Sequence, residues 1–407
     1  MNLRFHLSLI ASLTVACSSL PAQPAADTVL AATAQRIAHE TIVVDTHIDL
    51  PFRLERKWED ITQPTAGDFD EPRARQGGLD AAFMSVYLPP EDEEHGTATD
   101  HAEALIDLVN RIASTWPDKF AVAVSSRDVR TNTARGLISL CMGMENAAPI
   151  AGRLENVRHF YDRGIRYITL CHTKDNHVCD SSGDTTHTWK GLSPFGRQLV
   201  AEMNRVGIMV DVSHISDDAF FQVVALSKAP VIASHSACRA FTPGFQRNMS
   251  DDMIRLLAAN GGIIMVNFGS EFVNGRFSKW EDQRLTAIHS FMQERHTTYH
   301  DSLTQDFAKQ WRTEHPPEYA DVSEVAATID HIARLVGVDH VGFGSDFEGL
   351  GDQLPSGLKD VSMYPNVIAE LLKLGYSDGD VRKVCGENLL RVWDAVAKRA
   401  DELREVR

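Results

Sequence analysis

The stretch that decides the fold is IRYITLCH at residues 165–172, followed by GLSPFGRQLVAEMNRVGIMVDVSH at residues 191–214. An apolar strand pattern ends at His172, an amphipathic helical pattern follows, and a second apolar strand pattern ends at His214. Near-continuous apolar runs that alternate with helices are typical of parallel strands covered on their outer face. This unit therefore predicts a βα fold with polar side chains at the carboxyl ends of its strands.

The same unit recurs along the chain. Eight apolar, β-branched runs are found, at residues 41–50, 79–88, 137–146, 165–172, 206–214, 230–236, 261–270 and 339–349. Segments such as LENVRHFYDRG and DDMIRLLAANGG, which separate some of these runs, have apolar residues at helical spacing and close at glycine. Eight units predict an α/β fold in the form of a closed, TIM-like (β/α)8 barrel.

The distribution of polar residues supports the barrel over a doubly wound open sheet. An open sheet gathers its ligands at one switch point, whereas a barrel builds its site from nearly every strand end. Here the predicted strands end in His47, Asp49, Glu145, His172, His214, His235, Asn267 and Asp346.

Two further segments complete the predicted domain. Residues 271 to about 328 form a polar, helical insertion between the seventh and eighth strands, which could flank or cover the mouth of the barrel. Its His289, His296, His300 and His315 have no ligand spacing, so we expect them to be exposed. The segment DGDVRKVCGENLLRVWDAVAKRADELREV predicts a helix pair that packs on the barrel. Residues 27–407 are thus expected to be a single domain.

The N-terminus predicts export from a bacterial cytoplasm. Arg4 precedes a ten-residue apolar core that is too short to span a bilayer, and a Ser/Pro/Ala/Gln stretch follows, so residues 1–26 are interpreted as an export signal and linker. Cys17 closes the apolar core as in lipoprotein signals, whereas cleavage near Ala22 or Ala25 would release the protein. The expected location is the periplasm or, through a lipid on Cys17, a membrane surface.

Composition disfavours two classes of partner and limits disulfide pairing. The formal net charge of −16 disfavours nucleic acid and anionic membrane surfaces as partners. Without Cys17 five of the six cysteines remain, so at least one is unpaired, and no CxxC spacing indicates a structural zinc site.

The strand ends carry a ligand set for divalent metal. Residues two apart in a strand face the same side, which places His47 beside Asp49, and a carboxylate such as Glu145 can bridge two ions. His214 and His235 end adjacent strands and can share an ion. Each residue alone has a structural explanation, as a hydrogen-bonded pair, a salt bridge or a core histidine, but the joint pattern is harder to explain in that way.

We therefore predict a site with two ions that share Glu145. Imidazole and carboxylate ligands without thiolate suit zinc, with manganese or cobalt as substitutes. A water shared between the ions would be the nucleophile. Asp346 is placed to orient that water and carry its proton, and His172 to donate a hydrogen bond to the developing oxyanion.

Several motifs in order resemble the membrane (renal-type) dipeptidases, a metallopeptidase family. They are VVDTHIDLP, GGLDAAFMSVYLP, GMENAAP, RYITLCH, GLSPFGRQLVAEMNRVGIMVDVSH, IASHSACRAFTPGFQRNMSDDM, GFGSDFEG and GENLLRVW, and the resemblance runs from about residue 40 to residue 395. The resemblance implies a metal-dependent hydrolase barrel with two zinc ions bridged by a glutamate, and hydrolysis of dipeptides. The implied metal ligands are His47, Asp49, Glu145, His214 and His235, and the implied substrate contacts are His172, Arg247 and Asp346.

The chain departs from that family at Met84 and in TKDNHVCDSSG after His172, which affects side-chain preference and leaves the metal chemistry unchanged. Arg247 is either a surface arginine or a clamp on the free carboxylate of a dipeptide. A hydrolase of lactams, cyclic amides or esters on the same barrel is the alternative enzyme. A non-catalytic exported binding lipoprotein is disfavoured because the full set of residues is present. The resemblance is also compatible with a homodimer.

Overall fold

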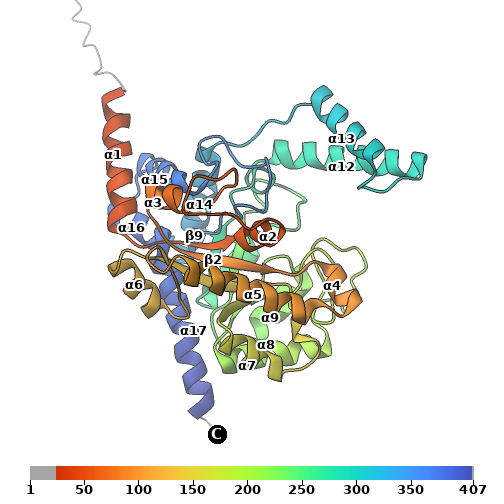
Figure 1. Ribbon diagram of the computed structural model, residues 1–407, viewed down its shortest axis with the longest axis horizontal. Coiled ribbons are helices and arrows are strands. Elements are labelled where there is room, and N and C mark those ends of the chain that lie inside the picture. Colours follow the sequence, from red (N-terminus) through yellow and green to blue (C-terminus); the bar gives the residue numbers. More distant parts are fainter. Residues whose placement is uncertain (1–23, 406–407) are drawn as a thin grey trace, which may run out of the picture.

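The computed structural model describes residues 24–405, and its centre is a closed barrel of eight parallel strands surrounded by helices (Figure 1). Hydrogen-bonded neighbours follow the order β2-β1-β9-β8-β7-β6-β5-β4, and pairing of β2 with β4 closes the circle. The strands are β1 (Val43–Ile48), β2 (Leu79–Tyr87), β3 (Phe120–Val122), β4 (Ile138–Glu145), β5 (Ile165–Thr169), β6 (Met209–Asp211), β7 (Ile232–Ser236), β8 (Ile263–Val266) and β9 (Val341–Phe343). The predicted (β/α)8 barrel is confirmed, and all eight predicted strands are part of it.

Strand β3 was not predicted. It pairs in parallel with the first half of one edge of β4, from Ile138 to Leu140, and β5 pairs with the second half of that edge. Three residues are too few to show an alternation of apolar and polar side chains, which explains why the sequence gives no signal for this strand.

Helices cover the outside of the barrel and follow most of the strands. The longer ones are α1 (Pro24–Glu40), α5 (Ala98–Thr115), α8 (Pro194–Val206), α9 (Asp217–Leu226), α10 (Asp251–Ala259), α12 (Gly275–Arg295), α13 (Ser302–Glu314), α14 (Val322–Val336), α15 (Tyr364–Lys373) and α17 (Asn388–Glu405). The shorter ones are α2 (Leu50–Arg56), α3 (Glu71–Gly77), α4 (Pro90–His95), α6 (Ser126–Ala134), α7 (Glu155–Asp162), α11 (Ser270–Val273) and α16 (Asp378–Arg382). Many begin at a serine or aspartate whose side chain accepts a backbone N–H of the first turn, as Ser193 does for α8.

The core has two parts, one inside the barrel and one between the strands and the outer helices. Inside, Phe83 lies 5.4 Å from Tyr167 and 5.3 Å from Trp393 of α17, measured between ring centroids. The C-terminal segment runs from α16 through a π-helical turn into α17, so it is one continuous helical segment instead of the predicted pair. At that turn a Cβ on Gly386 would meet the carbonyl oxygen of Ile42 at 2.4 Å, which places the turn against the start of β1. The C-terminal segment thus closes the end of the barrel opposite the strand ends that carry the polar residues.

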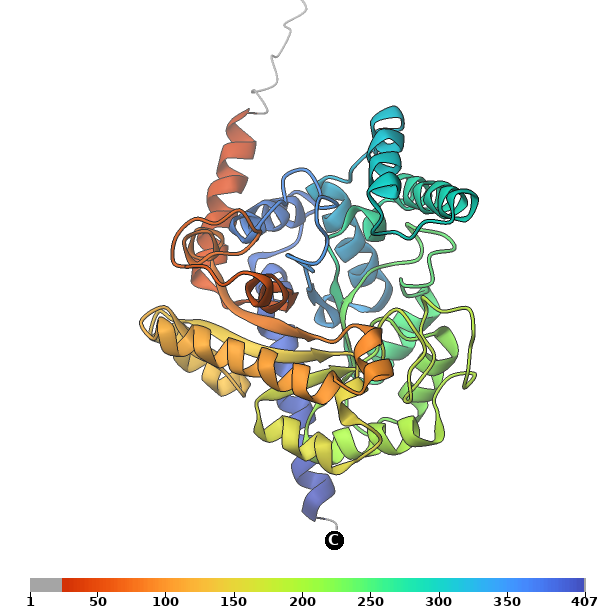
Figure 2. The same cartoon turned by 45° about the vertical axis from the view of Figure 1, so that its right-hand side comes forward.

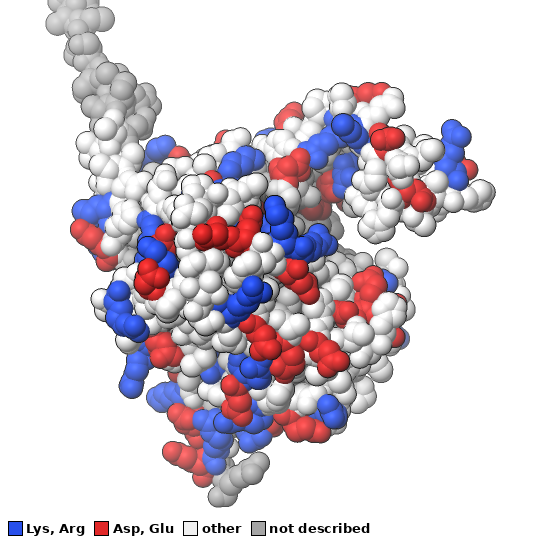
Figure 3. All heavy atoms as spheres, in the orientation of Figure 1, with Lys and Arg blue, Asp and Glu red and all other residues white. Residues whose placement is uncertain are grey.

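The predicted insertion between β8 and β9 is confirmed as helices α11, α12 and α13, which α14 follows. Helices α12 and α13 pack on each other through the stacked rings of Phe291 and Phe307 and project from the barrel as a hairpin (Figure 2). In the space-filling view the hairpin overhangs a hollow in the body, and acidic and basic side chains are intermingled over the visible face (Figure 3). The four histidines of the insertion are exposed, as expected.

The predicted export signal, including Cys17, lies mostly outside the described residues. Pro24 to Ala26, which were assigned to the linker, instead begin helix α1. The other five cysteines are buried free thiols. Between residues 24 and 405 no helix combines the length and the apolar character needed to cross a bilayer.

Candidate metal centre and active site

A cavity of about 240 Å³ opens at the carboxyl ends of the barrel strands. Seven of the eight predicted site residues line it, and the eighth, His47, lies directly beneath, with its ring stacked 3.8 Å from the ring of His235. The lining residues are Asp49, Phe52, Tyr87, Glu145, His172, His214, His235, Arg247, Phe272, Asp346 and Gly349. The fold therefore brings together side chains that are up to 299 positions apart in the chain, from His47 to Asp346.

Three of the candidate ligands are placed by strands. His47 lies in β1, Glu145 is the last residue of β4, and His235 lies in β7. Asp49 differs from the prediction, because it lies one residue beyond β1 at the N-cap of α2. A register shift between Asp45 and Ile48 still turns both side chains to the same site, with His47 Nε2 3.6 Å from Asp49 Oδ2.

Two further site residues depend on unusual backbone conformations. His214 has a φ angle of 70° and Asp346 of 66°, and two residues next to the site, Asn146 and Glu348, have φ angles of 85° and 71°. Non-glycine residues in this left-handed region cost free energy and persist where the surrounding structure holds them. Four of the eight described non-glycine residues with a positive φ angle thus lie in or next to the loops that aim polar side chains at the cavity.

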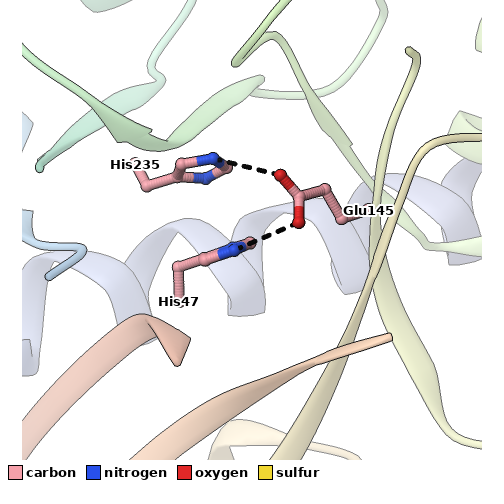
Figure 4. A group of neighbouring side chains, drawn as sticks. All are labelled: His47, Glu145 and His235. Atoms are coloured by element: carbon pink, nitrogen blue, oxygen red, sulfur yellow. Dashed lines mark ion pairs between the residues drawn. The ribbon is translucent and has the colours of Figure 1, made fainter. Parts of the chain in front are cut away.

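Glu145 is the centre of the cluster. Its carboxylate faces the stacked rings of His47 and His235, and each oxygen approaches a different imidazole (Figure 4). Both Nε2–oxygen distances are 3.4 Å, and His214 Nε2 lies 3.0 Å from Glu145 Oε1. Ser85 of β2 donates a hydrogen bond of 3.2 Å to Oε2. One carboxylate therefore contacts three imidazoles.

Burial and mutual proximity shift the pKa values of the cluster. Burial alone would raise the pKa of Glu145, but the nearby His47 and His172 and the hydrogen bonds from His214 and His235 hold it well below its usual range. Burial, reinforced by the positive charge of Arg247, keeps the pKa values of His214 and His235 well below that of free histidine. The pKa of His47 moves the other way: burial would lower it, but Tyr167, Glu145 and Asp49 raise it well above that of free histidine. The described residues thus hold an ionised carboxylate beside the neutral imidazoles of His214 and His235, and those two are in the protonation state that metal binding needs.

Asp49 and Asp346 approach each other across a glycine. A Cβ on Gly349 would lie 2.4 Å from Asp49 Oδ2 and 2.6 Å from Asp346 Oδ1, so a side chain at this position would collide with both carboxylates. Asn267 donates a hydrogen bond of 2.8 Å to Asp346 Oδ2. His47, Asp49 and Asp346 offer three ligand atoms within 4.8 Å of one another, as do His47, Glu145 and His235, and also Glu145, His172 and His214.

Arg247 lies inside the site and is not a surface residue. Its Nη1 donates to Ser236 Oγ at 2.7 Å and its Nη2 to the carbonyl oxygen of His235 at 2.8 Å, while its Nε is buried and has no partner among the described residues. The guanidinium lies 5.3 Å from the ring of Phe272. One edge of the guanidinium is therefore held by protein, and an N–H of the other edge remains for a ligand.

His172 lines the cavity between Glu145 and Tyr87. Its Nε2 lies 3.5 Å from Glu145 Oε1, its ring packs edge-on against Tyr87, and its Nδ1 is buried without a partner. Phe52 packs on Tyr87 with 5.6 Å between ring centroids, and these two rings form an apolar wall that the sequence reasoning did not identify. Tyr87 could have been identified as a site residue, because it lies at the end of the second predicted strand. Phe52 and Phe272 lie outside all predicted strands, so the sequence contains no comparable signal for them.

Comparison with known proteins gives one consistent result. A family model described as membrane dipeptidase matches residues 31–407. Dipeptidase tcpJ of Claviceps purpurea is 34% identical over 344 residues, which cover 82% of this chain and 71% of the relative. The probable dipeptidase PvdM of Pseudomonas aeruginosa has a TM-score of 0.81 and 28% identity over 91% of this chain and 99% of its own. A metallo peptidase of Rhodobacter sphaeroides was solved with a phosphinate mimic of the dipeptide L-Ala-D-Ala. It has a TM-score of 0.71 and 25% identity, and the match covers 88% of this chain and 99% of the relative.

Proposed function

The chain belongs to the membrane dipeptidase family and is a metal-dependent dipeptidase, and from this premise we propose that it acts on dipeptides with a free C-terminal carboxylate and uses two zinc ions. The match of the family model to nearly the whole chain supports the activity. The dipeptide mimic bound by the Rhodobacter sphaeroides relative supports the substrate class.

The residues of the site fit a pair of divalent ions. His47 Nε2 is buried, has no hydrogen-bond partner among the described residues, and points at acidic oxygens. An orphaned buried nitrogen is costly, and a cation between it and the surrounding oxygens would remove that cost. Nitrogen and oxygen ligands without thiolate suit zinc.

We assign His47 and Asp49 to one ion, His214 and His235 to the other, and Glu145 to both. When bound, such ions polarise a carbonyl and lower the pKa of water, which is the chemistry that peptide hydrolysis requires. Asp346 lies on the same side of the cavity as Asp49 and is proposed to hold and transfer a proton through its carboxylate. His172, which also lines the cavity, is proposed to donate a hydrogen bond to the substrate oxygen that gains negative charge.

The observation that carries the substrate proposal is the unpartnered Nε of Arg247. A buried guanidinium N–H without an acceptor is costly unless a ligand supplies one, and a carboxylate can accept from Nε and an Nη together. Because Arg247 lies on the rim of a small cavity beside His235, a carboxylate bound there would limit the substrate to one residue beyond the scissile bond.

A double cycle tests whether the substrate needs a free C-terminal carboxylate. It compares the wild type and Arg247→Ala, each with a dipeptide and with the C-terminal amide of that dipeptide. A charge-assisted pair contributes about 1.5–3 kcal/mol, so Arg247→Ala is expected to lower kcat/KM for the dipeptide roughly 10–150-fold. Arg247→Lys should recover only part, because an ammonium cannot form the two parallel bonds. Amidation of the substrate should impair the wild type strongly and the alanine variant little.

Arg239→Ala is the matched control, because Arg239 is on the same loop and pairs with Asp217 instead of facing the cavity. It should respond to amidation as the wild type does. Equal sensitivity of the wild type and Arg247→Ala to amidation would show that Arg247 does not bind the carboxylate. The alternative, a hydrolase of lactams, cyclic amides or esters, would then be favoured.

We also propose that the protein is exported, a proposal supported by the N-terminal sequence alone. The apolar core before Cys17 is the supporting observation. If Cys17 is acylated, Cys17→Ser should move the protein from the membrane fraction to the soluble periplasmic fraction. Recovery of the wild type in the cytoplasmic fraction would contradict export.

A further inference from the structure

Tyr167 of β5 forms a hydrogen bond with one ring nitrogen of His47. The Tyr167 hydroxyl lies 3.0 Å from the carbonyl oxygen of Thr46 and 2.8 Å from His47 Nδ1. A carbonyl oxygen can only accept, so the hydroxyl proton goes to Thr46 and the hydroxyl oxygen must accept a proton from His47 Nδ1. In its neutral form His47 therefore carries its proton on Nδ1, and the lone pair of Nε2 is left for a cation beside Glu145.

The sequence provides the space for this contact. A Cβ on Gly143 of β4 would lie 1.9 Å from the Tyr167 ring, so only glycine at this position lets the ring cross the barrel interior to His47. Tyr167 is fully buried, and a buried hydroxyl needs a partner for both its proton and its oxygen. Here both partners belong to β1.

Ser234 of β7 makes the equivalent contact with His235. Its Oγ lies 2.6 Å from Asp211 Oδ2 and 2.7 Å from His235 Nδ1. The buried Asp211 carboxylate also accepts from Thr169 Oγ1 and from the backbone N–H groups of Ser213 and Ser234, so four donors surround a group that, as a carboxylate, can accept but not donate. The Ser234 proton therefore goes to Asp211, and Ser234 Oγ accepts the proton of His235 Nδ1.

We infer that Tyr167 and Ser234 are positioning residues that fix His47 and His235 as Nδ1–H tautomers, so that both Nε2 lone pairs point into the metal centre. The inference rests on the proposed assignment of these two histidines as metal ligands. A ligating imidazole must present a free lone pair, and the hydrogen bond at its other nitrogen sets which tautomer is present. Without its acceptor, a buried Nδ1–H is unpaired and the non-ligating Nε2–H tautomer gains population.

The test measures the affinity for zinc of the full chain. Metal is removed with a chelator, and zinc alone is titrated back in competition with a chromophoric chelator. Tyr167→Phe and Ser234→Ala, which each remove one oxygen, are expected to weaken zinc binding by roughly 10–100-fold, the usual effect of losing an outer partner of a ligand. Ser234→Thr keeps the hydroxyl and should restore affinity toward the wild-type value.

Two controls remove a buried hydroxyl from the same surroundings without touching an imidazole. Tyr364→Phe removes the hydroxyl that binds Asp45, whose carboxylate holds the backbone N–H of His47. Thr169→Val removes another donor to Asp211. Both should bind zinc nearly as tightly as the wild type.

The outcomes separate this inference from the proposed function. If the wild type binds zinc and Tyr167→Phe and Ser234→Ala bind it equally well, the positioning roles are overturned and the ligand assignment stands. If all four hydroxyl deletions weaken binding to the same degree, the effect is general destabilisation and the positioning roles are also overturned. If the wild type itself binds no zinc, the ligand assignment fails and this inference fails with it.

Discussion

At the scale of single residues, the Asp346 carboxylate could either bind a metal ion or transfer a proton, and its position in the site bears on which of the two it does. Its Oδ1 lies 4.0 Å from His47 Nε2, which is compatible with a metal ligand, while its Oδ2 is held by Asn267. The left-handed backbone of Asp346 and the absence of a side chain at Gly349 bring its carboxylate to the edge of the cavity. We propose a proton-transferring role, because in the proposed assignment Asp49 and Glu145 would already provide carboxylates to the ion assigned to His47.

Asp346→Asn distinguishes the two roles. The amide cannot exchange a proton but keeps an oxygen in place, so we expect the variant to retain most of its metal and to lose roughly 10²–10⁴-fold in kcat. Metal content by elemental analysis and steady-state kinetics with one dipeptide are the measurements. Glu145→Gln is the comparison and should lose metal as well as activity. Near-normal activity of Asp346→Asn would rule out the proton-transferring role.

At the scale of elements, the junction of α11 with α12 joins the insertion to the active site. Phe272 of α11 lines the cavity, and its neighbour Glu271 is largely buried. Burial, together with the negative charges of Glu281 and Asp282 on α12, raises the pKa of Glu271 to about 7, although Arg284 and Arg247 act in the opposite direction. The attachment of the hairpin therefore contains a carboxyl group whose ionisation disfavours the folded state.

This carboxyl group predicts a pH-dependent stability. The pKa of Glu271 is higher in the folded than in the unfolded chain, so the neutral carboxyl group favours folding. Its contribution to the free energy of unfolding is fully present below the unfolded pKa of 4.5 and is lost as the pH rises through the folded pKa of about 7. Glu271→Gln has no charge to bury, so its free energy of unfolding should exceed that of the wild type by up to about 3 kcal/mol at pH 8 and by little at pH 4.5. Thermal or urea unfolding across this range is the measurement.

The exposed Glu294 of α12 provides the matched control, because Glu294→Gln changes the same group outside the junction. Its pH dependence should follow that of the wild type. A stability difference between Glu271→Gln and the wild type that does not change with pH would contradict a raised pKa at this position.

At the scale of the whole molecule, the barrel gathers acidic and imidazole side chains from most of its strands at one end. These groups come from β1, β4 and β7 and from the loops after β1, β5, β6 and β9, and they are largely buried. A cation bound among them would link the two halves of the barrel, since β1 and β7 lie on one side of Glu145 in Figure 4 and β4 carries the glutamate itself. Ligand binding to the native state alone stabilises it by mass action.

Removal of metal should therefore lower both stability and activity. A ligand present at a thousandfold excess over its Kd stabilises a protein by about 4 kcal/mol, so a chelator is expected to lower the Tm by several degrees. We expect two metal equivalents per chain, and activity should return with zinc, cobalt or manganese. The Tm of Glu145→Gln should be nearly insensitive to the chelator. Full activity of a rigorously metal-free preparation would contradict the proposed mechanism.

The sequence by itself determined the barrel, the helical insertion and the candidate site residues at the strand ends. Each follows from a local pattern, because strand and helix periodicities are short and the carboxyl ends of parallel strands must meet at one end of a barrel. The strand ends at Glu145 and His235 are examples, and both lie where the pattern places them.

Other features were decided only by the tertiary structure. Strand β3 is too short for a periodic signal, and Asp49 reaches the site through a register shift and a helix cap instead of strand alternation. The contact of Tyr167 with His47 joins residues 120 positions apart and depends on the absence of a side chain at Gly143. Likewise, Arg247 could equally have been a surface residue until the folded chain buried its Nε without a partner. Such features depend on which surfaces meet across the barrel, and no local spacing in the chain contains that information.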